Sequence, residues 1–345
     1  DAQIGRALNV ARELRSAESG HLFVVLGPSG VGKSSFLRAG LMPRLRRDDL
    51  HFLPMGIVRP QRNALTGDGG LADSIHDLRV GLGLTEPALG DIKQGVHDAG
   101  RVRAWLAEAQ RAAQRRNFAP AGAPLPTLVL PLDQAEELFT ADAGEQAGGL
   151  LTVLAELFDQ NNSQSIVAIA TIRSDRYEAL QTAPALANVV VRPFDDLKPM
   201  PQAQFKEVIC GPARRAGDSG GRLTIEPDLV DRLLEDWSRG ADTLPMLSLT
   251  LARLYQDYGD GAITLAEYDT MGGLRHVVQG EVDEVLSADP IVRQGQLDVL
   301  RTAFVPWLAT VNPDNDQPMR RVARWSDLPV ESHSLLEQFV ARRLL

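Results

Sequence analysis

The feature that most restricts the fold is a glycine-rich octapeptide, GPSGVGKS, at residues 27–34. It fits the phosphate-binding pattern G-x-x-x-x-G-K-[ST], which requires a buried strand before the loop and a helix after it. The apolar, β-branched run at 21–26 predicts the strand. Leucines at 37, 41 and 45 recur at helical spacing and predict a helix that begins near Lys33. The motif therefore lies in the required context and predicts an α/β P-loop fold.

The loop has the chemistry that a polyphosphate requires. Its small residues let consecutive backbone N–H groups approach the anion, and the N-terminus of the following helix faces the same charge. Lys33 is expected to neutralise the β- and γ-phosphates, and Ser34 to offer its hydroxyl to Mg²⁺. We therefore expect ATP or ADP with Mg²⁺ as the cofactors. The predicted phosphate-binding residues are Gly27, Pro28, Ser29, Gly30, Val31, Gly32, Lys33, Ser34 and Ser35.

Three carboxylates lie at or just after the end of a second apolar run, TLVLPLD at 127–133. Asp133 ends this predicted strand and is expected to hold the Mg²⁺ shell together with Ser34. Glu136 and Glu137 follow, and one of them is expected to polarise the attacking water, while the other orients it or caps the helix start. Glu137 is slightly favoured as the water-polarising residue. A plain acidic helix start remains an alternative for one of the two glutamates.

Arg173 ends the next apolar run, SIVAIATIR at 165–173. A cation at this place is expected to sense the γ-phosphate and to stabilise charge during phosphoryl transfer. The alternative is a structural salt bridge with Asp175 or another acid. The predicted catalytic residues are Lys33, Asp133, Glu136, Glu137 and Arg173.

The wider pattern alternates strands and helices up to about residue 196. A further short strand is predicted from NVVVRPF at 188–194, and helices from 100–116 and from the leucine-rich stretch around 150–158. Such alternation favours a parallel sheet with right-handed crossovers and helices on both faces. Residues 60–100 are rich in Gly, Asp and Pro, and only weak helices are predicted there. Beyond residue 196 helical patterns dominate.

Composition limits the partners. The chain has 345 residues, which predicts two or three domains, and its net charge of −9 disfavours nucleic acid and anionic membranes. The longest apolar runs are too short to span a bilayer. A single cysteine excludes an internal disulfide and favours a reducing, cytoplasmic compartment. The histidines form no zinc-binding pattern. The first residue is Asp1 rather than Met, which suggests a piece of a longer protein.

With these residues placed, the chain resembles the STAND class of signalling NTPases, which are related to NACHT and NB-ARC proteins. It is most similar to the novel STAND branch, over nearly the whole chain. The resemblance implies that the backbone of Gly5 and Arg6 borders the adenine and that Pro245 packs against the base. The motifs that carry it are IGR, GPSGVGKSSFLRAGLMPRL, LPLDQAEELFT, IATIRSDRYEAL, KPMPQAQFKEVICGPARRAG and TLPMLSLTLARLY.

The resemblance also implies a domain order, and this sequence departs from the family pattern at two places. The expected domains are a P-loop NTPase domain at 1–196, a helical domain at 197–290 and a truncated winged-helix domain at 291–345. Pro131 lies within a strand where the family usually has an aliphatic residue. The family's ADP-contacting histidine is expected just beyond Leu345, and His333 is not at that position.

The function that the resemblance implies is a regulated switch. ADP is expected to hold a closed monomer, ATP to favour an open form that self-associates, and slow Mg²⁺-dependent hydrolysis to reset the switch. Effector and sensor domains are expected elsewhere in a larger bacterial signalling or defence protein. One alternative is an ATP-dependent transcription regulator that binds DNA through the winged helix, which the acidic balance disfavours. Another is a nucleotide-bound scaffold without turnover.

Overall fold

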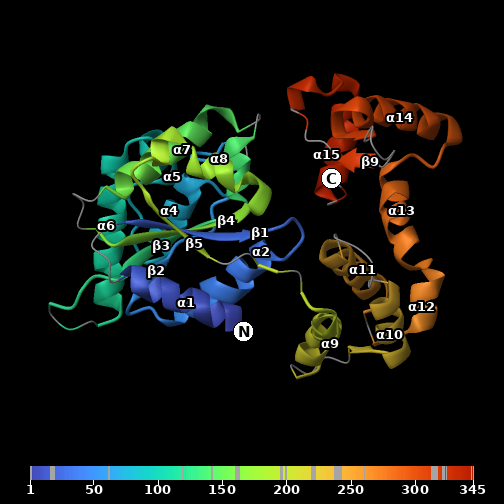
Figure 1. The fold of residues 1–345 in the computed structure, drawn as a ribbon, viewed down its shortest axis with the longest axis horizontal. Helices are drawn as coiled ribbons and strands as arrows, with labels where there is room; N and C mark the ends of the chain where they lie inside the picture. The colour runs from blue at the N-terminus through green and yellow to red at the C-terminus, as the bar shows by residue number, and fades with distance from the viewer. Residues whose placement is uncertain are drawn as a thin grey trace. The chain divides into compact units, whose positions relative to one another are not determined.

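The computed structural model shows two compact units, Asp1–Pro199 and Met200–Leu345, which are described separately (Figure 1). The described residues are 2–15, 20–60, 63–118, 120, 122–140, 143–159, 164–194, 197–198, 200–218, 223–236, 243–259, 261–311, 318–320, 323, 325–342 and 344.

The first unit is built on a five-stranded sheet with the order β2-β3-β4-β1-β5, in which every pairing is parallel. The loop-bearing strand β1 therefore lies between β4 and β5, and the strand that carries Asp133 is separated from it by β4 alone. The strands are β1 (His21–Gly27), β2 (Phe52–Pro54), β3 (Thr127–Leu132), β4 (Ile166–Arg173) and β5 (Val190–Phe194).

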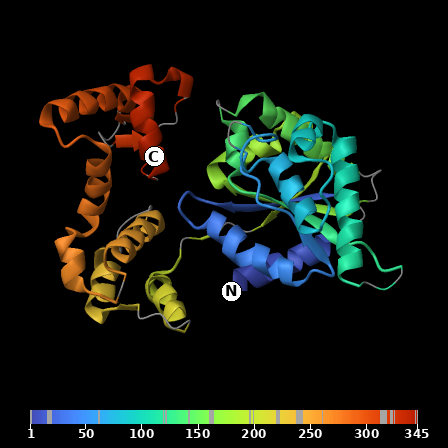
Figure 2. The ribbon, with the colours of Figure 1, turned by 180° about the vertical axis from the view of Figure 1, so that it is seen from behind.

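Helices cover both faces of this sheet (Figures 1 and 2). Alternate residues of the central strands enter two separate apolar cores, since successive side chains of a strand point to opposite faces. In β1, Leu22 and Val24 face one core while Phe23 and Val25 face the other. The first core is covered by α4 (Leu71–Gly81), α5 (Leu89–Gly95), α6 (Ala99–Arg116), α7 (Gly144–Leu157) and α8 (Tyr177–Gln181), the second by α1 (Ala2–Arg15) and the helix after the loop.

The helix after the loop is continuous but not uniform. It begins as α2 (Lys33–Ser35), continues as a π-helix over Phe36–Leu41 and ends as α3 (Met42–Arg47). Its apolar side faces the sheet through Leu37, Leu41 and Leu45, as the spacing predicts. Short π-helical segments within an α-helix are frequently found at functional sites.

The β2 strand is not predicted from the sequence, and the same region shows how Pro131 fits within β3. The β2 strand has three residues and ends at Pro54, which is too short for a periodicity signal. Pairing along β3 resumes at Val58, whose N–H donates to Pro131 O at 2.8 Å and whose carbonyl accepts from Asp133 N at 2.9 Å. Pro131 has no N–H to donate, and it lies where regular β2 pairing has already ended.

The second unit is mainly helical and has two apolar clusters. The first cluster is formed by α9 (Gln202–Asp218), α10 (Pro227–Asp236), α11 (Thr243–Tyr258) and α12 (Leu265–Thr270), with the paired short strands β6 (Thr224–Ile225) and β7 (Ala262–Ile263). The second is formed by α13 (Gly273–Val285), α14 (Pro290–Ala303) and α15 (His333–Ala341), and the same region holds the antiparallel pair β8 (Ala309–Val311) and β9 (Pro318–Arg320).

Ion pairs join the helices of this unit. Arg253 on α11 and Arg342 after α15 both bind Glu281 on α13, at 2.8 and 3.0 Å. The division of this region into a helical domain and a winged helix stays a prediction. Within the part of the chain that the structure describes, no helix has both the length and the apolar character needed to cross a bilayer.

Candidate nucleotide-binding site

The glycine-rich loop joins the carboxyl end of β1 to the helix that starts at Lys33. Gly30 and Gly32 have φ values of 73° and 94°, a region that side-chain-bearing residues rarely adopt. At Gly27 the restriction is space, because an added Cβ would lie 2.8 Å from Val31 Cγ1 and 3.2 Å from Leu197 O. The glycines predicted from the motif are thus required by the local backbone.

Lys33 is folded back across the loop. Its Nζ donates to Gly27 O at 2.9 Å and to Pro28 O at 2.8 Å, and the residue is buried. Burial lowers the pKa of Lys33, and the nearby carboxylate of Glu136 opposes that shift more than any other charge. The ammonium group therefore lies at the loop and within the electrostatic reach of Glu136.

Asp133 is held by donors from two different elements. Its carboxylate is 1% exposed, and its Oδ1 accepts from Ser34 Oγ at 2.8 Å and from Thr171 Oγ1 at 2.9 Å. Its Oδ2 accepts from Arg38 Nε at 2.9 Å. Ser34 and Arg38 are four residues apart on the helix after the loop, and Thr171 belongs to β4. The structure thus brings Ser34 and Asp133 together, as the sequence analysis predicts.

Thr171 and Arg38 are not among the predicted site residues, although the residue type of the first and the spacing of the second pointed to them. Thr171 is the only polar residue in the run Ile166–Ile172. Arg38 follows Ser34 by four positions, which places both on one face of a helix. The contact itself joins segments that are 95 residues apart, so only the fold reveals it.

The oxygen donors around Asp133 fit a magnesium ion. A hydroxyl and a carboxylate are hard ligands of the kind that Mg²⁺ prefers. Among the residues that the structure describes, no cluster of three or more His, Cys, Asp or Glu side chains has a metal-binding geometry. A site with one hydroxyl and one carboxylate ligand suits an ion that keeps waters and takes further ligands from phosphates.

The two glutamates after Asp133 lie in different settings. Gln134 has a φ of 60°, and its N–H donates to Thr171 Oγ1 at 2.9 Å, which turns the chain into a short 3-10 helix at Ala135–Phe139. Glu136 Oε2 is buried and has no hydrogen-bond partner. Glu137 is half-buried on the same turn. These settings favour Glu136 over the slightly preferred Glu137, and the assignment of the water-polarising residue stays a prediction.

Arg173 lies at the end of β4, and its side chain pairs with Asp175. Nε and one terminal nitrogen of Arg173 each donate to a different oxygen of Asp175, both at 2.9 Å. This hydrogen bonding raises the pKa of Arg173 and lowers the pKa of Asp175. The structural salt bridge considered from the sequence is therefore present. The charge of Arg173 also helps to lower the pKa of Lys33, so the guanidinium lies within reach of the loop.

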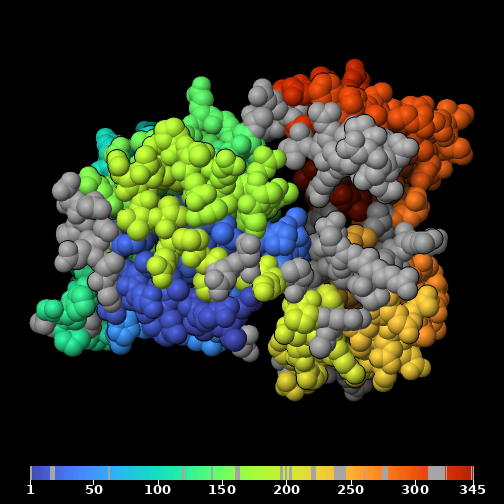
Figure 3. Space-filling view, in the orientation of Figure 1, coloured from blue at the N-terminus to red at the C-terminus, as the bar shows by residue number. Residues whose placement is uncertain are grey.

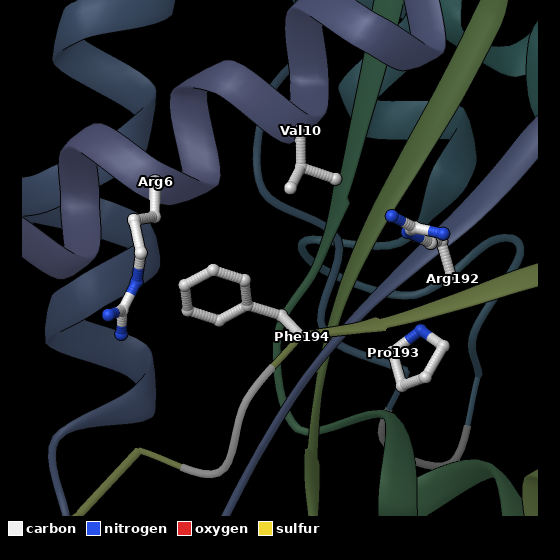
Figure 4. A pocket seen from close by; sticks show the side chains of 5 residues that line it. All are labelled: Arg6, Val10, Arg192, Pro193 and Phe194. Atoms are coloured by element: carbon white, nitrogen blue, oxygen red, sulfur yellow. The ribbon is translucent and has the colours of Figure 1, made fainter.

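Arg6 lines a pocket of about 280 Å³ between α1 and β5 (Figure 4). Val10, Arg192, Pro193 and Phe194 complete its lining, and the Phe194 ring is seen between the two arginines. The blue surface of α1 borders the yellow-green surface of the β5 region in Figure 3. Phe194 also stacks on Phe36, which follows Ser35 in the loop helix, with ring centroids 6.0 Å apart.

Of the two remaining predicted base contacts the structure describes Gly5 in full and only the backbone of Pro245, and it also describes His333. Gly5 is exposed on α1, next to Ile4, whose side chain lies against Gly40 of the loop helix. Pro245 is in the first turn of α11, and its side chain lies outside the described residues. His333 starts α15 and packs against Trp325, with ring centroids 4.9 Å apart.

The chain is similar to several solved structures at low sequence identity. The chain is similar to the Aeropyrum pernix ORC1 protein in complex with DNA, with 13% identity and a TM-score of 0.50 over 92% of this chain and 73% of that one. The ADP form of the Aeropyrum pernix ORC2 protein matches at 12% identity and a TM-score of 0.44, covering 99% of this chain and 93% of that one. A chain of the Drosophila ORC bound to GC-rich DNA and Cdc6 matches at 11% identity and a TM-score of 0.39, covering 99% and 47%.

The first of these similarities supports the fold alone, an α/β unit with a parallel sheet followed by a helical C-terminal region, as the sequence analysis predicts. No curated protein sequence matches the chain. The family model named Novel STAND NTPase 1 matches residues 2–345. The phosphate loop and the predicted NTPase fold agree with that match, and the chain belongs to the novel STAND NTPase family.

Proposed function

We propose that this chain is an ATP- and ADP-binding switch that hydrolyses ATP slowly with Mg²⁺. The observation that carries the proposal is the 2.8 Å hydrogen bond from Ser34 Oγ to Asp133 Oδ1. It joins the end of the phosphate loop to the strand-end carboxylate, the two protein groups that a Mg²⁺–nucleotide site needs. Membership of an NTPase family supports the same assignment.

Each group at the loop has a defined role in binding. The backbone N–H groups of residues 27–34 would surround the phosphates, and Lys33 would move its ammonium group from the carbonyls of Gly27 and Pro28 to the phosphate oxygens. Because Ser34 donates its proton to Asp133, its oxygen lone pairs remain available to a metal. When bound, Mg²⁺ would supply positive charge beside the β- and γ-phosphates.

The base would lie on the α1 side of the loop helix. Phe36 is two residues beyond Ser34 and stacks on Phe194 of the Arg6–Arg192 pocket. This apolar surface suits a purine, and the family resemblance assigns adenine contacts to Gly5 and Arg6. The family resemblance also assigns a base contact to Pro245, and that assignment stays a prediction.

Hydrolysis would depend on Glu136 and Arg173. Glu136 has a buried oxygen without a partner and lies within electrostatic reach of Lys33, so it is suited to accept a hydrogen bond from the attacking water. Arg173 would stabilise charge on the transferring group after it releases part of its contact with Asp175.

The switch would act through the second unit. ADP would favour a closed monomer, and ATP an open form that self-associates, with effector and sensor domains in a larger signalling or defence protein. Such a switch needs different nucleotide affinities in its two states. Light scattering of the protein with ADP, with ATP and with a non-hydrolysable ATP analogue tests it. The switch model expects a larger particle with ATP or the analogue than with ADP, whereas one mass in all three mixtures contradicts self-association.

Calorimetric titration of ATP and ADP into the wild type and the Lys33→Met variant tests binding directly. We expect heat of binding from the wild type only. Equal behaviour of the two proteins would contradict the proposed site. Matched Glu136→Gln and Glu137→Gln variants then separate the switch from a scaffold. We expect ATP turnover to fall by about 10²–10⁴-fold in the first and to change little in the second, with ADP binding kept in both.

A further inference from the structure

Arg38 contacts the candidate site although no part of the phosphate-loop motif requires a cation at its position. It is 46% exposed, yet its Nε donates at 2.9 Å to Asp133 Oδ2, and that carboxylate is 1% exposed. Neither the phosphate-loop pattern nor the proposed roles of Lys33 and Ser34 require a cation at this place.

The geometry makes the helix after the loop a clamp on one carboxylate. Ser34 binds Oδ1 and Arg38 binds Oδ2 from the same helical face, while Thr171 binds Oδ1 from β4. A carboxylate offers about four acceptor positions, and these contacts take three of them. Arg38 is the only one of the three donors that carries charge, so it also balances the charge of Asp133.

This balance has a consequence for nucleotide binding. A buried, unbalanced carboxylate beside a phosphate site would repel the phosphates, and a divalent cation would then be needed to offset the repulsion. With Arg38 in place, much of this repulsion is already cancelled. We propose that Arg38 is a positioning residue that neutralises Asp133 and thereby makes ADP binding weakly dependent on Mg²⁺. The inference rests on the proposed nucleotide site and adds to it a control of metal dependence.

The measurement is the ratio of the ADP dissociation constant in EDTA to that in saturating MgCl₂, obtained by calorimetry on the nucleotide-free chain. In Arg38→Met we expect this ratio to be about tenfold larger than in the wild type, the order of effect of one partly screened charge. Arg38→Lys keeps the charge and should keep a ratio close to that of the wild type. Arg46→Met, which removes an exposed arginine of α3, is the matched control and should behave as the wild type.

A double-mutant cycle separates action through Asp133 from direct contact with the phosphates. In an Asp133→Asn background there is no carboxylate charge to balance, so Arg38→Met should leave the ratio unchanged. A continued tenfold effect there would mean that the guanidinium acts on the nucleotide itself, and would overturn the proposal. If Arg38→Met alone folds poorly, the comparison of Asp133→Asn with the double variant can still be made, because the double variant has no unpaired buried charge.

The outcomes distinguish this inference from the proposed function. If the wild type binds ADP but Arg38→Met and Arg46→Met give equal ratios, the role of Arg38 is refuted and the nucleotide site stands. If the wild type binds no ADP either in EDTA or in MgCl₂, the proposed function fails, and the role of Arg38 fails with it.

Discussion

Replacing Thr171 with valine tests whether the bonds around Asp133 also stabilise the first unit. Thr171 is fully buried, and its hydroxyl both donates to Asp133 Oδ1 and accepts from Gln134 N, each at 2.9 Å. The variant removes a hydrogen bond to a charged acceptor, at about 1.5–3 kcal/mol, and leaves a backbone N–H without its acceptor, at about 1–3 kcal/mol. Because these costs are not fully additive, we expect a loss of about 3 kcal/mol.

Differential scanning calorimetry without nucleotide measures this loss. For a unit of this size each kcal/mol shifts the midpoint by about 2–4 °C, so Thr171→Val should lower it by about 6–12 °C. The relevant transition is the one that ADP raises in the wild type. Thr127→Val is the matched control, because Thr127 is also buried in a strand but its hydroxyl makes a neutral contact, to Ser165 Oγ at 2.7 Å.

We expect the Thr127 variant to lose only about 1 kcal/mol, and Thr171→Ser, which keeps the hydroxyl, to lose less than Thr171→Val. If Thr171→Val lowers the midpoint no more than Thr127→Val does, the bonds to Asp133 and Gln134 do not stabilise the unit as argued.

Two further predictions concern the phosphate loop, and a third concerns a buried arginine of α4. The pKa of Lys33 is lowered in the folded chain, so the unfolded chain binds more protons as the pH approaches 10.5. The free energy of unfolding of the wild type, minus that of Lys33→Met, should therefore increase with pH. Urea titration at several pH values measures this difference. Gly32→Ala meets no atom within 4 Å but must adopt a φ near 94°, so it should cost about 1–3 kcal/mol in thermal stability and weaken ADP binding in calorimetry. The side chain of Arg79 is 2% exposed and donates to Trp105 O at 3.0 Å and to Glu108 at 2.8 Å. Arg79→Met should therefore lower the free energy of unfolding by about 2–4 kcal/mol and leave ADP affinity unchanged.

The parts of the site that could be predicted from the sequence are those whose chemistry requires a particular local backbone geometry. The loop at 27–34 needs glycine at defined positions and a strand and helix at its ends, so the motif predicts both its backbone and its neighbours. Asp133 was predicted because a phosphate loop needs a carboxylate at the end of a neighbouring strand to hold the Mg²⁺ shell, and Asp133 ends an apolar run. These predictions depend on patterns within a few residues.

The features that sequence missed depend on pairing between distant segments. The three-residue β2 strand has no periodicity of its own and exists because β3 pairs with it. The Arg38–Asp133 contact and the Thr171 hydrogen bonds require the order β3-β4-β1, which places the end of β3 across β4 from the loop. Even the Arg173–Asp175 pair, although local, could not be chosen over a role at the phosphate from residue types alone.

The strand order also brings the segment after β5 close to the phosphate loop. After β5 the chain returns to the loop, where Leu197 N donates to Leu26 O at 2.8 Å. The neighbouring Gly27 leaves no room for a side chain against Leu197, so the start of the phosphate loop and the end of the first unit are in direct contact. A phosphate that shifts the backbone at Gly27 would therefore act first on the segment that leads to Met200. Under the proposed switch, this contact with Leu197 is the first point at which a change at the phosphate loop would be felt outside the loop.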